Sequence, residues 1–308
     1  MEIENKERIL VKALKEICSL KGIKATFFSY DWIAKLEYKN NVMLIYGYQF
    51  PINDAVSDML CRDKSATFEV LTNSKIRAIE HWLFMSPTWK HYIDDQSDNQ
   101  RLRELLRKHE RIVLKPNEGT SGENVFLVED DYTLKTASSA IFKKSHMMAV
   151  SPYYVIDDEY RIIVVEDEVR LIYRKIRPFV VGDGVSSIKK LAKDKYTGFE
   201  FDLPDNTLLP KDSIYTLTWK HNLGAGASAE IITDPNLYSY LSKIAIDAKD
   251  AVGIKFASVD IAKTNDEFRV LEINSGVMAE HFSRQSKANY DIILNIYAEM
   301  ICNYLDVN

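Results

Sequence analysis

Apolar residues in the first part of the chain recur at two different periods, which predict a helix followed by short strands. One stripe has the spacing of a helix face and ends before Gly22, a residue type that commonly follows the last helical turn. The stripe consists of Ile9, Leu10, Ala13, Leu14, Ile17 and Leu20. Apolar runs at Ala25–Phe28 and Val42–Tyr48 predict strands, and Asn53 is expected to cap the next helix. Residues 1–62 are therefore predicted to form a short N-terminal α/β unit.

The rest of the chain divides by its pattern into two larger predicted units, residues 63–148 and residues 149–308. The first should contain a helix from Ser65, a charged helix at Asp98–His109, and strands at Arg111–Lys115 and Val125–Glu129. The second should contain strands at Val150–Ile156, Tyr160–Val165, Val169–Lys175, Ile214–Trp219, Phe256–Ile261 and Phe268–Asn274, and helices at Leu237–Ala251 and Tyr290–Leu305. A chain of 308 residues is long enough for two or three such compact lobes.

The composition is that of an ordinary globular protein, with 46 % hydrophobic and 28 % charged residues. A formal net charge of −5 provides no basic field for a polyanion, so nucleic acid is not expected as a partner. Cys18, Cys61 and Cys302 form no C-x-x-C pair, which argues for a reducing compartment and against disulfides or structural zinc. The charged N-terminus and the lack of an apolar run of ~20 residues predict no signal peptide and no membrane span, and hence a cytoplasmic protein.

Two apolar segments near the C-terminus carry three oxygen ligands. In a strand that ends at Asn274, Glu272 and Asn274 share one face, while Leu271 and Ile273 fill the other. Asp260 lies in a second apolar run, which is expected to be the neighbouring strand. Oxygen ligands from two adjacent strands suit a hard cation such as Mg²⁺, which takes few protein ligands and leaves room for substrate phosphates. Asp260, Glu272 and Asn274 are therefore the candidate metal ligands.

A Gly-rich turn after a predicted strand offers a candidate phosphate site. Lys115 at the strand end precedes small residues whose backbone N–H groups could surround phosphate oxygens, namely Gly119, Thr120, Ser121 and Gly122. The turn is not a Walker A loop, because no Gly-Lys-Ser/Thr closes it and a strand rather than a helix follows. A β-hairpin loop with a surface lysine is the alternative. Lys64, near a predicted helix start, would ordinarily be a solvated residue and gains meaning only beside the other features.

Two further groups could bind the rest of a nucleotide and an acidic substrate. The extended connector Ser151, Pro152, Tyr153 and Tyr154 can present backbone groups to an adenine edge, and Glu159 follows as a carboxylate for ribose hydroxyls. An acidic turn between two strands is the alternative. The second group could hold a substrate carboxylate and stabilise a phosphoryl or oxyanion charge, or else line a solvated sheet face. It comprises Arg161, Arg174, Lys175, Arg177, Lys220 and Asn222.

With these residues in place, the chain resembles the ATP-grasp superfamily of carboxylate–amine ligases. Within it, the chain is similar to the ribosomal-protein glutamate ligase, cyanophycin synthetase and glutathione-forming groups. The matching segments, in order, are Asp63-Lys64, Lys115-Pro116 with Gly119–Gly122, Pro152-Tyr153-Tyr154, Glu159-Tyr160-Arg161, Lys175 to Gly182-Asp183-Gly184, His221-Asn222-Leu223, and Asp260 with Glu272 and Asn274. Pro152 replaces an acidic residue of many relatives and Lys220 stands where some carry arginine, so the adenine contact and one substrate contact are expected to differ.

The resemblance implies an α+β ATP-grasp fold, in which two α+β lobes clamp ATP beside the short N-terminal unit. The implied cofactors are ATP and Mg²⁺, for which Mn²⁺ can substitute. The implied phosphate contacts are Lys64, Lys115 and the Gly119–Gly122 loop, the implied adenine contacts are Ser151 to Tyr154, and Glu159 is the implied ribose contact. Arg161, Lys175, Lys220 and Asn222 are the implied catalytic residues, which would hold a carboxylate as it becomes an acyl phosphate and reacts with an amine.

The implied substrates are amino acids or small peptides, with no nucleic acid and no membrane as partner. A homodimer is expected only because dimers are the commonest soluble assembly. Two alternatives stay open: an ATP-grasp kinase that stops at a phosphorylated product, and a nucleotide-binding protein without catalysis. The intact Asp260, Glu272 and Asn274 set and the two lysines argue against the second.

Overall fold

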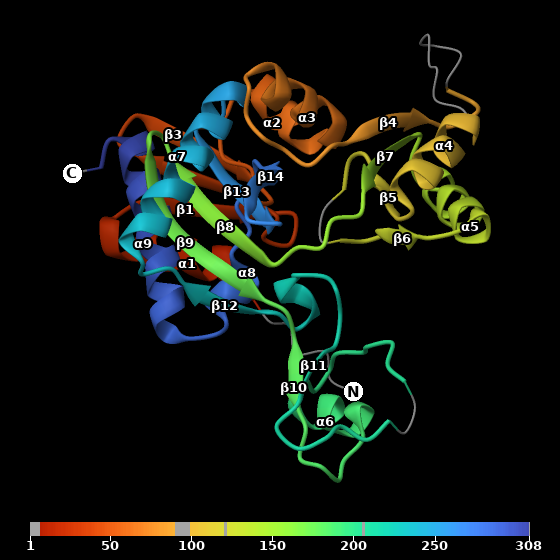
Figure 1. Ribbon diagram of the computed structural model, residues 1–308. Coiled ribbons are helices and arrows are strands. Elements are labelled where there is room, and N and C mark those ends of the chain that lie inside the picture. The colour runs from red at the N-terminus through yellow and green to blue at the C-terminus, as the bar shows by residue number, and fades with distance from the viewer. Residues whose placement is uncertain (1–6, 90–98, 120–121, 205–206, 308) are drawn as a thin grey trace.

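The computed structural model describes residues 7–89, 99–119, 122–204 and 207–307, and its largest sheet has five antiparallel strands in the order β12-β9-β8-β13-β14 (Figure 1). The strands are β8 (Asp158–Val165), β9 (Glu168–Ile176), β12 (Ser228–Ile231), β13 (Phe256–Thr264) and β14 (Glu267–Asn274). Along β8, Ile162 and Val164 enter one hydrophobic cluster and Ile163 and Val165 enter another. The sheet is therefore covered on both faces, and the predicted α+β class is confirmed.

Three helices cover the first face of this sheet. α7 (Pro235–Val252) packs Leu241 and Ala245 onto it, and α2 (Ala55–Arg62) and α3 (Lys64–Asn73) add Cys61 and Leu71 to the same cluster. Asp234 caps α7 by accepting from two backbone N–H groups. The helix predicted from Ser65, at the start of the unit of residues 63–148, thus lies on the five-stranded sheet.

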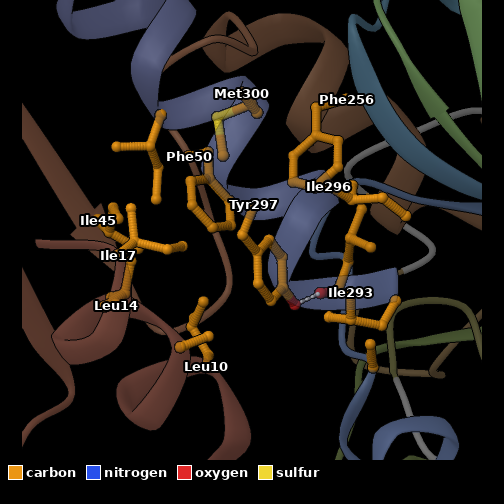
Figure 2. Close-up of a cluster of buried hydrophobic side chains, with 14 of the residues drawn as sticks. Leu10, Leu14, Ile17, Ile45, Phe50, Phe256, Ile293, Ile296, Tyr297 and Met300 are labelled. Atoms are coloured by element: carbon orange, nitrogen blue, oxygen red, sulfur yellow. Dashed lines mark hydrogen bonds between the residues drawn. The ribbon is translucent and has the colours of Figure 1, made fainter. Parts of the chain in front are cut away.

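The opposite face is covered by the N-terminal unit and the last helix. α1 (Ile9–Lys21) and α9 (Lys287–Leu305) meet around Phe50 and Tyr297, whose rings stack 5.8 Å apart (Figure 2). The Tyr297 hydroxyl donates a hydrogen bond of 2.8 Å to the Val277 carbonyl. The predicted helix and its stop are confirmed, since Gly22 ends α1 in the left-handed region at φ 65°. The short helix α8 (Glu280–Ser283) places Glu280 to accept from the N–H of Ile9.

The N-terminal unit also holds a three-stranded sheet of β1 (Lys24–Phe28), β2 (Ile33–Tyr38) and β3 (Asn41–Tyr46). The prediction that Asn53 caps a helix is wrong, because Asp54 is the N-cap of α2. Asn53 instead bonds the backbone of Phe256 in both directions, with its Nδ2 donating to the carbonyl and its Oδ1 accepting from the N–H, each at 2.8 Å. Asn53 therefore ties the N-terminal unit to β13.

A second lobe lies to one side of the main sheet and has a four-stranded sheet in the order β4-β7-β5-β6 (Figure 1, right). Its elements are β4 (Trp82–Met85), α4 (Asn99–His109), β5 (Ile112–Pro116), β6 (Phe126–Val128), α5 (Asp131–Phe142) and β7 (Met147–Pro152). The lobe has its own core, which includes Phe84, Ile112 and Ile141. A capping box between Asp130 and Thr133 begins α5, a helix that the apolar pattern did not predict.

A small module projects from the end of β9 (Figure 1, bottom). It contains β10 (Phe179–Val181), α6 (Ile188–Lys195) and β11 (Ile214–Thr216), and the one-turn helix η2 (Leu223–Ala225) follows it before β12. Its small core includes Val180, Ile188 and Leu217. The predicted unit boundaries after residues 62 and 148 stay predictions. No helix in the described part of the chain is long and apolar enough to span a bilayer.

Candidate functional site

β13 and β14 carry the predicted metal ligands side by side. Asp260 lies opposite Glu272 in the antiparallel register, and Asn274 donates a hydrogen bond from Nδ2 to Glu272 Oε1 at 3.1 Å. The register shifts directly after Asp260, so Leu271 has no partner on β13. Leu271 is only half-buried, whereas Ile273 is buried as expected. The three oxygen-bearing side chains thus come from adjacent strand positions.

Asp260 is held by two cations. Arg161 donates from Nε to Oδ1 and from Nη2 to Oδ2, both at 2.7 Å, and Lys175 Nζ donates to Oδ2 at 2.8 Å. Lys175 also donates to Glu159 Oε1 at 2.5 Å. The side chains of Asp260, Lys175 and Glu159 are only 1 %, 5 % and 9 % exposed. We call Glu159, Arg161, Lys175 and Asp260 the charged network. It brings together residues that were predicted to bind ribose, the substrate and the metal ion.

Burial and charge act against each other in this network. Burial by itself would raise the pKa of Asp260, but Arg161 and Lys175 hold it well below its ordinary value. Burial raises the pKa of Glu159, and the attraction of Lys175 offsets this only in part. Lys175 is desolvated and close to Arg161, yet the carboxylates of Asp260 and Glu159 raise its pKa. At neutral pH, Asp260 is therefore ionised and both of its cations are charged.

The two predicted phosphate lysines approach Glu272 from different elements. Lys64 begins α3 and Lys115 lies near the end of β5. Burial lowers the pKa of Lys64, and it lowers the pKa of Lys115 to about 8, in each case against the attraction of Glu272. Lys64 Nζ also donates to the Gly119 carbonyl at 3.0 Å. The structure thus brings both lysines, one metal candidate and the start of the Gly-rich loop together.

Asn117, which had not been singled out in the sequence, joins α3 to that loop. Its side chain is buried, and its Oδ1 accepts from the Ser65 N–H at 3.2 Å and from the Ser65 hydroxyl at 3.0 Å. Its carbonyl accepts from the Lys64 N–H at 3.2 Å. The signal available in the sequence was its position directly after Lys115-Pro116. Asn117 therefore positions both lysine-bearing segments.

The Gly-rich loop also approaches the segment before the metal strands. Gly122 has a φ of +72°, and a Cβ at this position would lie 3.5 Å from Asn222 Nδ2. Asn222 in turn accepts from the Gly224 N–H at 2.8 Å. Thr120 and Ser121, which were predicted to contact phosphate, lie outside the described residues. Asn222 thus lies beside the loop.

Lys220 and His221 connect the loop side with the charged network. Lys220 Nζ is 3.4 Å from the carbonyl of Val125, just after the loop. His221 is buried with Nδ1 3.7 Å from Glu159 Oε2, and burial lowers its pKa to about 4. The four residues implied to be catalytic therefore lie in two places. Arg161 and Lys175 belong to the network, and Lys220 and Asn222 lie at the loop.

The predicted adenine connector begins inside a strand. Ser151 and Pro152 are buried and pair with β5, so β7 ends at Pro152 rather than near Ile156 as predicted. The Tyr153 N–H donates to the Arg111 carbonyl at 3.0 Å, and Tyr154 follows outside the strand. The extended connection between the two lobes therefore starts at Tyr153.

The donor set on β13 and β14 fits a hard cation, although one ligand is shared. Carboxylate and amide oxygens are the ligands that Mg²⁺ prefers. Among the residues that the structure describes, no three His, Cys, Asp or Glu side chains are grouped so that they could hold a metal. The candidate set differs from such a group because its third ligand is the amide of Asn274. Both oxygens of Asp260 are engaged by Arg161 and Lys175. Glu272 and Asn274 are therefore the ligands that fit most directly.

Known proteins resemble this chain in sequence. Residues 217–298 match the RimK-like ATP-grasp domain. A tetrahydromethanopterin:alpha-L-glutamate ligase of Methanococcus maripaludis is 30 % identical over 198 residues, which cover 64 % of this chain and 54 % of that protein. The glutathione biosynthesis bifunctional protein GshAB of Clostridium perfringens is 23 % identical over 256 residues, covering 74 % of this chain and 31 % of that protein. The chain thus spans about half the length of the glutamate ligase and less of the other relative.

Solved structures share the fold at lower identity. A bifunctional glutathione synthetase from Pasteurella multocida aligns with a TM-score of 0.58 at 18 % identity, over 95 % of this chain and 44 % of that chain. A D-alanine–D-alanine ligase from Bacillus anthracis aligns with a TM-score of 0.56 at 16 % identity, over 83 % and 69 % of the two chains. At these identities the likeness concerns the arrangement of the elements.

Proposed function

We propose that this chain, which has the fold of the ATP-grasp ligases and contains a RimK-like ATP-grasp domain, uses ATP to join a carboxylate to an amine. In the proposed reaction a carboxylate oxygen attacks the γ-phosphorus of ATP, and ADP leaves. The amine then attacks the carbonyl carbon of the acyl phosphate and loses a proton as the C–N bond forms. The C–O bond breaks, and inorganic phosphate leaves. The products are an amide, ADP and phosphate.

One observation carries the proposal: Lys64, Lys115 and Glu272 come together from α3, β5 and β14. The two ammonium groups would bind phosphate oxygens, while Glu272 faces them from the strand pair that also bears Asp260 and Asn274. Phosphoryl transfer depends mainly on positioning and charge stabilisation, which such a set of residues supplies.

Glu272 and Asn274 would hold the metal ion, with Asp260 as a further ligand. When bound, Mg²⁺ supplies charge neutralisation for the phosphates during transfer. Asp260 must share its oxygens with Arg161 and Lys175, so a bound metal and these cations compete for it. An anionic substrate would meet the guanidinium and ammonium groups beside these ligands.

Arg161 and Lys175 would orient the acid. Arg161 offers a planar fork that matches a carboxylate, and Lys175 offers a second charge in a site with little water. Lys220 and Asn222 lie beside the Gly-rich loop and would stabilise the charge that develops when the amine attacks. Burial of the charged network supports the exclusion of water, which would hydrolyse an acyl phosphate.

The names of the relatives suggest the substrate class. They include ligases named for alpha-L-glutamate and for D-alanine, and proteins of glutathione biosynthesis. We propose that one substrate of this chain is an amino acid and that the other is an amino acid or a small peptide.

A phosphate-release screen tests the function. The full chain is incubated with ATP, Mg²⁺ and pairs of acids and amines that include L-glutamate, D-alanine, cysteine and short peptides. ADP and phosphate should form only when both an acid and an amine are present, and Glu272→Ala should abolish this release. Glu267→Ala on the same strand is the control, because that residue pairs with Arg77 and Arg269 at the surface. Full ADP release by Glu272→Ala contradicts the proposed site.

The same screen separates the ligase from a kinase. A kinase would release ADP with a single substrate and leave a stable phosphorylated product, whereas the ligase forms an amide and free phosphate. Mass spectrometry of the products therefore decides between them, and AMP with pyrophosphate would contradict both.

A further inference from the structure

His81 lies beside the predicted phosphate lysines, although the sequence indicated no role for it. A parallel bridge between Ala78 and Val270, and a hydrogen bond of 2.8 Å from the Ile79 N–H to the Val270 carbonyl, hold the segment before β4 against β14. Because Val270 precedes Glu272 by two positions, this pairing carries His81 along β14 toward the site. His81 comes to line a small cavity together with Lys64 and Glu272.

The His81 ring carries an unused hydrogen-bonding atom. The residue is only 3 % exposed, and its Nε2 has no partner within the part of the chain that the structure describes. Buried polar atoms without a partner are rare and call for an explanation. Burial, followed by the charges of Lys115 and Lys64, holds the pKa of His81 well below its ordinary value. Its ring N–H is directed to the Ile79 backbone, so the neutral imidazole offers Nε2 as an acceptor.

Lys115 is the matching donor. Its ammonium donates no hydrogen bond to another described residue, and it feels Glu272, Lys64 and Glu159 only through their charges. An ammonium group has three N–H donors, of which bound phosphate uses one or two. The strand register places Lys115 and His81 on the same face of the four-stranded sheet, because Lys115 is aligned with Ala149 and Leu83, and His81 precedes Leu83 by two positions. The cavity that His81 lines, of about 10 Å³, has room for about one water.

We propose that His81 is a positioning residue for ATP, which accepts a hydrogen bond from Lys115 directly or through one buried water and so directs the ammonium to the phosphates. A carboxylate in this place would neutralise the lysine, whereas a neutral imidazole orients it and leaves its charge for the ligand. The inference rests on the proposed function, because it assigns His81 to the ATP site of that reaction.

Calorimetric titration of the full-length chain with ATP and Mg²⁺ tests this role. His81→Phe fills the space without an acceptor and should weaken ATP binding about tenfold, the usual size for a hydrogen bond to a charged group. His81→Gln keeps an acceptor near the position of Nε2 and should restore most of the affinity. His109→Phe is the matched control, because the Nε2 of His109 also lacks a partner in the described residues, but its ring lies tilted against Trp82 with the ring centroids 5.6 Å apart.

A second measurement does not depend on the stability of variants. In a spectrum of the wild-type chain with ¹⁵N-labelled histidine, His81 Nε2 should be unprotonated at neutral pH, and its resonance should move when ATP and Mg²⁺ are added. A protonated Nε2, or an unmoved resonance in protein that binds ATP, overturns the inference. Equal ATP affinity of wild type and His81→Phe, or equal losses in His81→Phe and His81→Gln, overturns it too. Failure of the wild type to bind ATP refutes the proposed function instead.

Discussion

Replacing Lys175 by methionine probes the charged network, because the partners of this lysine are as buried as the lysine itself. The variant leaves Glu159 and Asp260 in place, with side chains 9 % and 1 % exposed. Breaking a buried ion pair costs about 3–5 kcal/mol. Arg161 still binds Asp260 through two hydrogen bonds, so the lower end, about 3 kcal/mol, is expected. At about 2 °C per kcal/mol for a chain of this size, the calorimetric Tm should fall by about 6 °C.

The pH dependence of this loss follows from Glu159. Burial raises the pKa of Glu159 in the folded chain, and removal of Lys175 raises it further. Because the unfolded chain has the ordinary pKa of about 4.3, the folded variant is relatively stabilised as Glu159 becomes protonated. The difference in Tm between wild type and Lys175→Met should therefore be smaller at about pH 5 than at about pH 8.

Lys249→Met is the matched control. The Lys249 side chain is 6 % exposed, similar to Lys175, but its partners Asp167 and Asp250 are 88 % and 58 % exposed. When Lys249 is removed, these carboxylates return to water, so the fall in Tm should be far smaller and should not depend on pH in the same way. Equal losses in the two variants would refute the reasoning that the burial of the partner acids sets the cost.

Three further outcomes are expected. Asn53→Ala removes both bonds to the backbone of Phe256 and should lower the Tm by several degrees, and Asn53→Asp should lower it by a smaller amount. An unchanged Tm in both variants would contradict the tie between the N-terminal unit and β13. Tyr297→Phe leaves the Val277 carbonyl without its donor and should cost about 1–3 kcal/mol in a denaturant titration, unlike Tyr304→Phe at the surface. Burial lowers the pKa of Lys115 to about 8, so ATP affinity should fall between about pH 7 and pH 9 as the lysine loses its charge. Lys115→Arg should keep its affinity across that range. Parallel pH profiles of the two proteins would contradict the role of Lys115 in binding phosphate.

The sequence predicted those parts of the site that depend on local geometry. Strand alternation put Glu272 and Asn274 on one face, and the neighbouring apolar run brought Asp260 opposite Glu272. The resemblance to ATP-grasp ligases, which rested on several motifs in one order, is confirmed. The roles of the individual site residues stay predictions.

Other features depend on contacts between distant segments, which no local pattern encodes. The bulge at Leu271 depends on how β13 and β14 pair. Asn53 was mistaken for a cap because its partner lies about 200 residues away. Lys175 and Arg161 were predicted to contact substrate, but the strand register also places them on Asp260. His81 had no sequence signal, since its significance comes from the pairing of Ala78 with β14.

Equilibrium binding of ATP in the presence and absence of Mg²⁺ tests the central claim most directly, namely that Lys64, Lys115 and Glu272 form an ATP site. The wild-type chain should bind one ATP, and Mg²⁺ should tighten this binding. Glu272→Gln should lose the Mg²⁺ effect while Glu267→Gln keeps it, because Glu267 lies at the far end of β14 and pairs with Arg77 and Arg269. No binding to the wild type, or an undiminished Mg²⁺ effect in Glu272→Gln, would contradict the account.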